Sequence, residues 1–81
     1  MSIQNEMRRV KLTNLEHGVK RLRMEIESLA RTICINLDCS LRRPEELPIG
    51  EVDSQFDELK SKWADLTVSL EEIKRLEEEL K

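Results

Sequence analysis

The residues that could perform chemistry in this sequence are two cysteines and one histidine. Cys34 and Cys39 form a C-x4-C pair, and His17 is the only histidine. Five residues apart on a helix, the two thiols point in different directions, so an internal disulfide is geometrically poor. A zinc site needs four ligands, and two more would have to come from His17 or from a second copy of the chain. We therefore predict no metal and no cofactor, and we leave a redox role of the cysteines open.

A catalytic role for His17 would need a second group to work with. A general base acts on a positioned nucleophile or on a substrate proton, and it is itself oriented by a further side chain. No serine or cysteine nucleophile accompanies His17 in the sequence around it. The sequence therefore predicts no catalytic residues and a protein that is not an enzyme.

The composition points to long helices. The chain has 81 residues, 38% of them hydrophobic and 38% charged, with only two Gly and two Pro. A β-sandwich or barrel needs a turn every ~8–12 residues, which so few turn residues do not supply. The net charge of −3 gives no bulk attraction to nucleic acid or to anionic lipid. The sequence lacks a signal-peptide pattern and any apolar run of ~18 residues, so we expect a cytoplasmic protein that does not bind membranes.

The first half of the chain carries a heptad repeat of apolar residues. The spacing alternates between three and four, which is the pattern of a coiled-coil seam. This pattern predicts a helix from about residue 5 to about residue 38. Its seam residues are Leu12, Leu15, Val19, Leu22, Ile26, Leu29 and Ile33, followed by the polar Asn36.

The second half repeats the pattern and predicts a helix from about residue 51 to residue 81. Gly50 or Asp53 is the expected cap at its start. Glu77 occupies one polar seam position near its end. The predicted seam residues are Val52, Phe56, Leu59, Trp63, Leu66, Leu70 and Ile73, with Leu80 one heptad further on.

Turn residues are concentrated in a connector of about residues 39–50, so the two helices are expected to fold back antiparallel as a single domain over residues 1–81. Pro44 is expected to begin one helical turn, and Leu41, Leu47 and Ile49 to plug the end of the bundle. A connector that docks a partner is the alternative. Residues 1–43 carry a net charge of +4 and residues 44–81 a net charge of −7. Folding back brings Arg8, Arg9 and Lys11 near the acidic run Glu77, Glu78 and Glu79, and Lys20, Arg21 and Arg23 near Glu71 and Glu72.

A lone two-helix hairpin leaves much of each seam exposed, and small domains of this size need an additional source of burial. We therefore predict an all-α hairpin that assembles as a homodimeric four-helix bundle, with a trimer or a hetero-complex as alternatives. Asn36 either fixes the register of this bundle or lies where the bundle frays. The predicted oligomer interface consists of Leu15, Val19, Leu22, Ile26, Leu29, Phe56, Leu59, Trp63, Leu66, Leu70 and Ile73.

Two further surfaces are candidates for binding. A thinner apolar stripe, Ile3, Val10, His17 and Met24, recurs every seven residues on the face opposite the first seam. It is either a set of scattered surface residues or a contact for a partner helix. Together with the connector it gives a possible partner face of Val10, His17, Met24, Arg42, Arg43 and Leu47.

The functional expectation is a non-enzymatic assembly or protein-interaction module. The alternative is a small dimeric regulator that binds nucleic acid through a basic face of the first helix. That face consists of Arg9, Lys20, Arg21 and Arg31. Nucleic-acid binding is disfavoured because the chain is acidic overall and has no aromatic residues interleaved with the basic ones.

Overall fold

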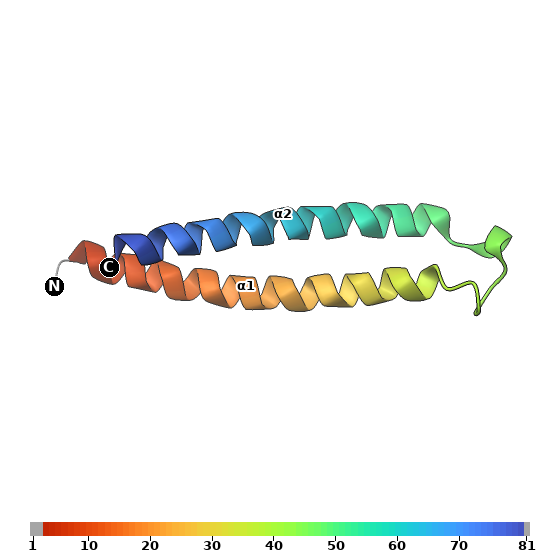
Figure 1. The fold of residues 1–81 in the computed structure, drawn as a ribbon, viewed down its shortest axis with the longest axis horizontal. Coiled ribbons are helices and arrows are strands. Elements are labelled where there is room, and N and C mark those ends of the chain that lie inside the picture. The colour runs from red at the N-terminus through yellow and green to blue at the C-terminus, as the bar shows by residue number, and fades with distance from the viewer. Residues whose placement is uncertain (1–2, 81) are drawn as a thin grey trace.

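The computed structural model describes residues 3–80, which form a single antiparallel pair of long helices (Figure 1). Helix α1 spans Ile3–Asn36 and helix α2 spans Ile49–Glu79. One turn of 3-10 helix, η1 at Pro44–Glu46, lies in the connector between them. The molecule is a rod of 63 × 15 × 15 Å, and the start of α1 and the end of α2 lie at the end opposite the connector. The predicted all-α hairpin is confirmed, whereas its assembly into a dimer stays a prediction.

Local hydrogen bonds explain where the helices end and begin. Beyond Asn36 the carboxylate of Asp38 accepts hydrogen bonds from the backbone N–H of Ser40 at 2.9 Å and from its hydroxyl at 2.7 Å. This side-chain turn competes with helix continuation.

The turn predicted at Pro44 is confirmed. Helix α2 starts at Ile49, directly after Pro48, and no side chain caps it, so the expected caps Gly50 and Asp53 are wrong.

The seam of α1 lies where the sequence predicts it. Val19 and Ile33 are buried, and the other heptad residues are half-buried against α2. Asn36 closes the row, and its Nδ2 donates a hydrogen bond to Oε1 of Gln55 at 3.0 Å. Among the two readings of Asn36, this contact favours the one in which it fixes the register of the two helices.

The seam of α2 differs from the prediction in one of its two rows, where a row is a set of residues spaced by seven along the helix. Phe56, Trp63 and Leu70 are 49%, 60% and 38% exposed, and Glu77 is exposed as well. The central row of Val52, Leu59, Leu66 and Ile73 can be combined with either neighbouring row, because both give alternating spacings of three and four. The half-buried or buried row is instead the largely polar one, Gln55, Lys62, Ser69 and Leu76. The seam prediction for Phe56, Trp63 and Leu70 is therefore wrong within a single chain.

The connector does not plug the end of the hairpin as expected. Leu47 is half-buried, but Leu41 and Ile49 are exposed. Because α2 begins at Ile49, the phase of the helix places this residue in the exposed row of Phe56, seven residues further on.

Little of the apolar surface is covered. Among the described residues only Val19, Ile33 and Leu76 are buried hydrophobic side chains, while twelve large hydrophobic side chains are exposed. The radius of gyration is 18.3 Å, whereas a compact domain of this length has about 12 Å. Within residues 3–80 neither helix has a stretch long and apolar enough to cross a bilayer.

Replacement of Gly18 by alanine should stabilise the hairpin. Gly18 lies in the middle of α1, and a Cβ built there meets no atom within 4 Å. Because a helical glycine costs about 1 kcal/mol relative to alanine, we expect Gly18→Ala to raise the free energy of unfolding by about that amount in a urea titration. Gly50→Ala, in the first turn of α2, is the control with a smaller gain. A loss of stability in Gly18→Ala would contradict the open surroundings of this residue.

Candidate functional site

One flank of the helix pair is held by ion pairs. Lys11 Nζ lies 3.2 Å from a carboxylate oxygen of Glu72, and Arg8 Nε lies 3.2 Å from one of Glu79. The third pair joins Lys62 Nζ to Glu25 at 2.5 Å. We call this side of the hairpin the ion-paired flank. It is defined by the ion-paired residues that directly precede a seam residue, namely Lys11 and Glu25 in α1, and Glu72 and Glu79 in α2. Their partners Arg8 and Lys62 occupy seam positions.

The expected pairing of the helix ends is confirmed only in part. Arg8 does contact the acidic run, at Glu79, but Lys11 lies one turn further along and meets Glu72 instead. Among the described ion pairs, Arg21 contacts Glu25 of its own helix, and the expected approach of this region to Glu71 and Glu72 is wrong. The residue numbers of the facing pairs Arg8–Glu79 and Glu25–Lys62 add up to 87, which places Arg21 level with Leu66 rather than with Glu71 or Glu72.

These contacts change the pKa values of the carboxylates involved. The hydrogen bond from the Lys62 ammonium lowers the pKa of Glu25, and the same contact raises the pKa of Lys62. Hydrogen bonds from Arg75 and Lys11 lower the pKa of Glu72. All these groups are solvated, so the pairs select the orientation of the helices and contribute little to their stability.

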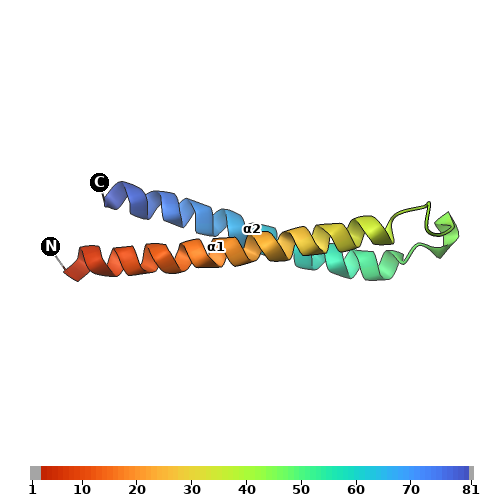
Figure 2. The same cartoon turned by 90° about the horizontal axis from the view of Figure 1, so that it is seen from below.

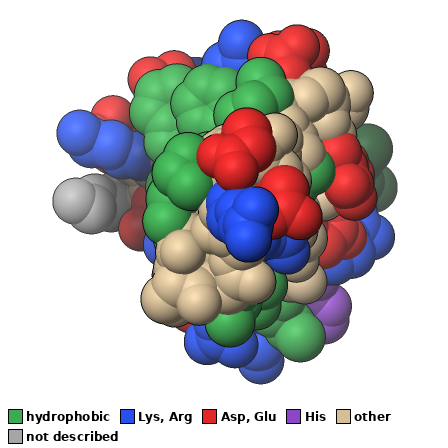
Figure 3. Space-filling view, turned by 90° about the vertical axis from the view of Figure 1, so that its right-hand side faces the viewer, with side chains coloured by type: hydrophobic (Ala, Val, Ile, Leu, Met, Phe, Trp, Pro, Cys, Tyr) green, Lys and Arg blue, Asp and Glu red, His purple; other side chains and the backbone are tan. Residues whose placement is uncertain are grey.

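The opposite flank of α2 carries an apolar stripe with no partner in the described chain. We call it the α2 stripe, and it consists of Ile49, Phe56, Trp63 and Leu70, spaced by seven residues. Its last three members each directly follow a seam residue, which places them across the seam from Glu72 and Glu79 at 100° per residue. Figure 3 shows hydrophobic side chains gathered on one side of the connector end of the rod, where α2 begins.

The two aromatic residues of the chain form the centre of the α2 stripe. Phe56, Leu59, Lys60 and Trp63 line a shallow hollow of about 250 Å³. The ammonium of Lys60 lies 5.5 Å from the centre of the Phe56 ring, a cation–π distance. Both aromatic rings therefore present large, solvent-facing surfaces, of the kind that anchor protein–protein interfaces.

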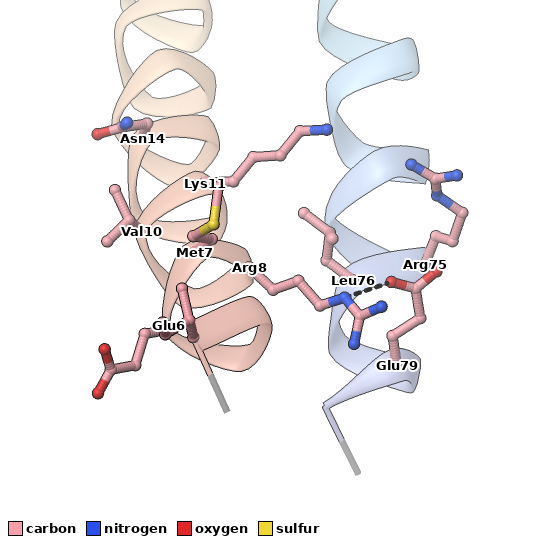
Figure 4. A pocket seen from close by; sticks show the side chains of 10 residues that line it. Glu6, Met7, Arg8, Val10, Lys11, Asn14, Arg75, Leu76 and Glu79 are labelled. Atoms are coloured by element: carbon pink, nitrogen blue, oxygen red, sulfur yellow. Dashed lines mark ion pairs between the residues drawn. The ribbon is translucent and has the colours of Figure 1, made fainter. Parts of the chain in front are cut away.

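A second hollow lies between the free ends of the helices, which diverge there (Figure 2). Its volume is about 750 Å³, and its lining includes Ile3, Met7, Val10 and Leu76. Figure 4 shows Leu76 pointing from α2 toward α1 and Arg8 reaching across to Glu79. The hollow thus combines an apolar lining with one ion pair at its edge.

The outer face of α1 holds the thin stripe and part of the basic cluster predicted from the sequence. Val10, His17 and Met24 are all exposed, as the sequence predicts. Two adjoining hollows share Met24, one lined with Lys20 and Arg21 and the other with Arg31. The structure thus gathers three members of the predicted basic cluster along one face, while Arg9, also exposed, lies more than two turns away along α1.

The predicted connector face is only partly accessible, and the cysteines stay apart from any cluster. Arg43 is exposed, whereas Arg42 is half-buried, like Leu47. Cys34 and Cys39 are both exposed free thiols. Within residues 3–80 there is no group of three metal-ligating side chains.

The α2 stripe includes Ile49, which the sequence analysis places in the connector and not in the second helix. Ile49 was expected in the connector plug, although its distance of seven residues from Phe56 was visible in the sequence. Since a heptad step returns to the same side of a helix, the start of α2 at Ile49 extends the stripe by two turns.

The Glu25–Lys62 pair should give a pH-dependent contribution to stability. Its lowered pKa means that Glu25 stabilises the fold above the ordinary glutamate range of about 4–4.5, and that this contribution disappears as the pH falls through the folded-state value. We expect Glu25→Gln to lower the free energy of unfolding at pH 7, and the difference from the wild type to shrink as the pH falls below the ordinary glutamate range. Glu27→Gln, at an exposed position two residues away, is the control. A constant difference between wild type and Glu25→Gln at all pH values would refute this account.

Comparison of the chain with protein-family models, with curated proteins and with solved structures finds no match.

Proposed function

We propose that this protein is a non-enzymatic assembly module that associates with itself and thereby completes a helical bundle. The observation that carries the proposal is the α2 stripe, which exposes both aromatic residues of the chain on one flank. Monomeric proteins rarely expose contiguous apolar surface, and patches rimmed by polar residues mark interaction sites.

The exposed area of the hairpin supports this proposal quantitatively. The accessible surface is 6361 Å², whereas a compact monomer of 9.6 kDa has about 5,100 Å². The excess of roughly 1,300 Å² exceeds the ≈ 800 Å² that each partner buries in an interface of standard size. Association of two copies would therefore bring the surface per chain close to that of an ordinary folded protein.

The same architecture leaves a surface that could bind other proteins. The proposed partner face joins Val10, His17 and Met24 on α1 with Arg42, Arg43 and Leu47 of the connector. In a bundle that forms through the α2 stripe, the outer face of α1 stays accessible. A module of this kind would present its α1 faces and connectors to a partner while the stripes hold the copies together.

Nucleic-acid binding is the second candidate function. The specific observation in its favour is that Lys20, Arg21 and Arg31 line adjoining hollows on the outer face of α1. The net charge of −3 opposes it, because affinity for a nucleic acid depends on released counterions and hence on accessible positive charge. Retention on heparin that falls steeply with salt would favour this function over the assembly role.

Light scattering coupled to size exclusion tests the proposed self-association. We expect a mass of twice 9.6 kDa at micromolar concentration. A mass of a single chain at every concentration up to the millimolar range would overturn the proposal. A mass of three chains would show that the protein forms the alternative trimer and not the dimer.

A seam variant tests whether association and folding are coupled. Leu66 is half-buried in the central seam row of α2, and Val68, two residues away, is 65% exposed. A buried charge without a partner is strongly destabilising, so Leu66→Asp should lose both the helical circular dichroism signal and the dimer mass. Val68→Asp, the matched control, should keep both. A folded, helical monomer in Leu66→Asp would contradict a bundle that folds and assembles together.

A further inference from the structure

We infer that a second copy of this chain covers the α2 stripe, and that the two hairpins pack with their connectors at the same end of the rod. This inference rests on the self-association proposed above and specifies which flank is used and in which orientation. The flank opposite the ion pairs is called the apolar flank. It consists of the α2 stripe together with Arg23, Ala30 and Leu37 of α1.

The phase of α1 assigns these residues to the apolar flank. Arg23, Ala30 and Leu37 each directly follow a seam residue, as the last three members of the α2 stripe do. Lys11 and Glu25, which precede seam residues, lie on the other side with the ion pairs. The hairpin therefore has one flank closed by charged contacts between its helices. On the other flank apolar and aromatic side chains dominate in the connector half, while Arg9, Glu16 and Glu77, which also follow seam positions, lie toward the free ends.

A second copy fits the apolar flank better than an unrelated partner does. The roughly 1,300 Å² of excess surface per chain is of the size that each partner of a stable dimer covers. In a two-fold interface the same flank is used on both copies, so each covers the other. Both aromatic rings, which are typical interface anchors, lie within it.

The ion pairs define which residues of the two helices lie at the same height along the rod. The residue numbers of the pairs Arg8–Glu79 and Glu25–Lys62 both add up to 87, which is also the mean of the sums for Lys11–Glu72 (83) and Asn36–Gln55 (91). Trp63 is therefore level with Arg23 or Met24, Phe56 with residues near Ala30, and Ile49 with residues near Leu37.

Two orientations bring apolar flank against apolar flank. With the two-fold axis along the rod, the connectors lie together and each α2 faces the partner's α1. With the axis across the rod, the connectors lie at opposite ends, and each helix faces its own copy. The charges on the facing helices distinguish the two orientations.

The charges favour connectors at the same end. Helix α1 carries a net charge of +3 over residues 3–36, and α2 carries −6 over residues 49–79. With the connectors together, every pair of neighbouring helices has opposite charge. Trp63 then faces the partner subunit's Arg23 in cation–π geometry, and Phe56 faces the partner subunit's Ala30. In the other orientation α1 faces a second α1 and α2 faces a second α2, so helices of like charge are neighbours.

Pulsed electron paramagnetic resonance on spin-labelled dimers tests the orientation. Cys39 lies in the connector and is exposed, so Cys34→Ser leaves a single labelling position. With the connectors together, the two labels lie one to two helix diameters apart, about 10–20 Å, plus the length of their linkers. With opposite connectors, the two labels lie more than about 40 Å apart, which is most of the 63 Å length of the rod. A dimer that gives only the long distance overturns the orientation and leaves self-association intact.

Substitution of the central stripe residue tests the flank. We expect Trp63→Glu to raise the dissociation constant of the dimer at least tenfold, because loss of a central aromatic anchor is among the costliest changes in an interface. Val68→Glu, on a different side of α2, should change it less than twofold. An unchanged dissociation constant in Trp63→Glu overturns the choice of flank. A wild type that stays monomeric at all concentrations overturns the self-association itself.

The fluorescence of Trp63, the only tryptophan, reports on the same flank without a substitution. Its indole is 60% exposed in the single hairpin. Formation of the dimer should shift its emission to shorter wavelengths as the concentration passes the dissociation constant. A dimer whose emission does not shift would place Trp63 outside the interface and refute the inference.

Discussion

Two helices that lie side by side can cover only one strip of each other's surface, and this geometric constraint governs the whole molecule. Each helix buries a seam two residues wide, and everything else on its circumference meets solvent or another chain. With three buried hydrophobic side chains among the described residues, the seam alone provides a very small core. The distribution of the remaining apolar residues, and above all of the two aromatic ones, therefore decides how the protein behaves.

The sequence predicts α1 well because only one pair of neighbouring rows is continuously apolar there, and the thin stripe of Ile3, Val10 and Met24 lies on the opposite face. In α2 the central row of Leu59 and Leu66 has the apolar row of Trp63 on one side and a largely polar row on the other, and the heptad spacing is compatible with a seam on either side. The choice between them depends on polar partners across the helix pair. The contacts Asn36–Gln55 and Glu25–Lys62 are made when the row of Gln55 and Lys62 faces α1, and such pairwise contacts are not visible in a periodicity.

The candidate site could be predicted by residue type but not by location. Phe56 and Trp63 are interface candidates from composition and spacing, yet their position on a flank depends on the rotation of α2 about its axis. The basic face of α1 was predictable because it lies on a single helix, where phase alone determines which residues are neighbours. Ion pairs between the helices were predictable only in sign, since the length of the connector sets their register.

The elongated shape has a hydrodynamic consequence. A rod of 63 × 15 × 15 Å has an axial ratio of about four, and an elongated particle experiences more friction in water than a sphere of equal mass. Even a single hairpin would then tumble slowly about its short axes and leave a gel-filtration column ahead of globular proteins of its own mass. Elution volume calibrated with spherical standards would therefore overstate the number of chains in the particle, whereas sedimentation velocity would separate shape from mass.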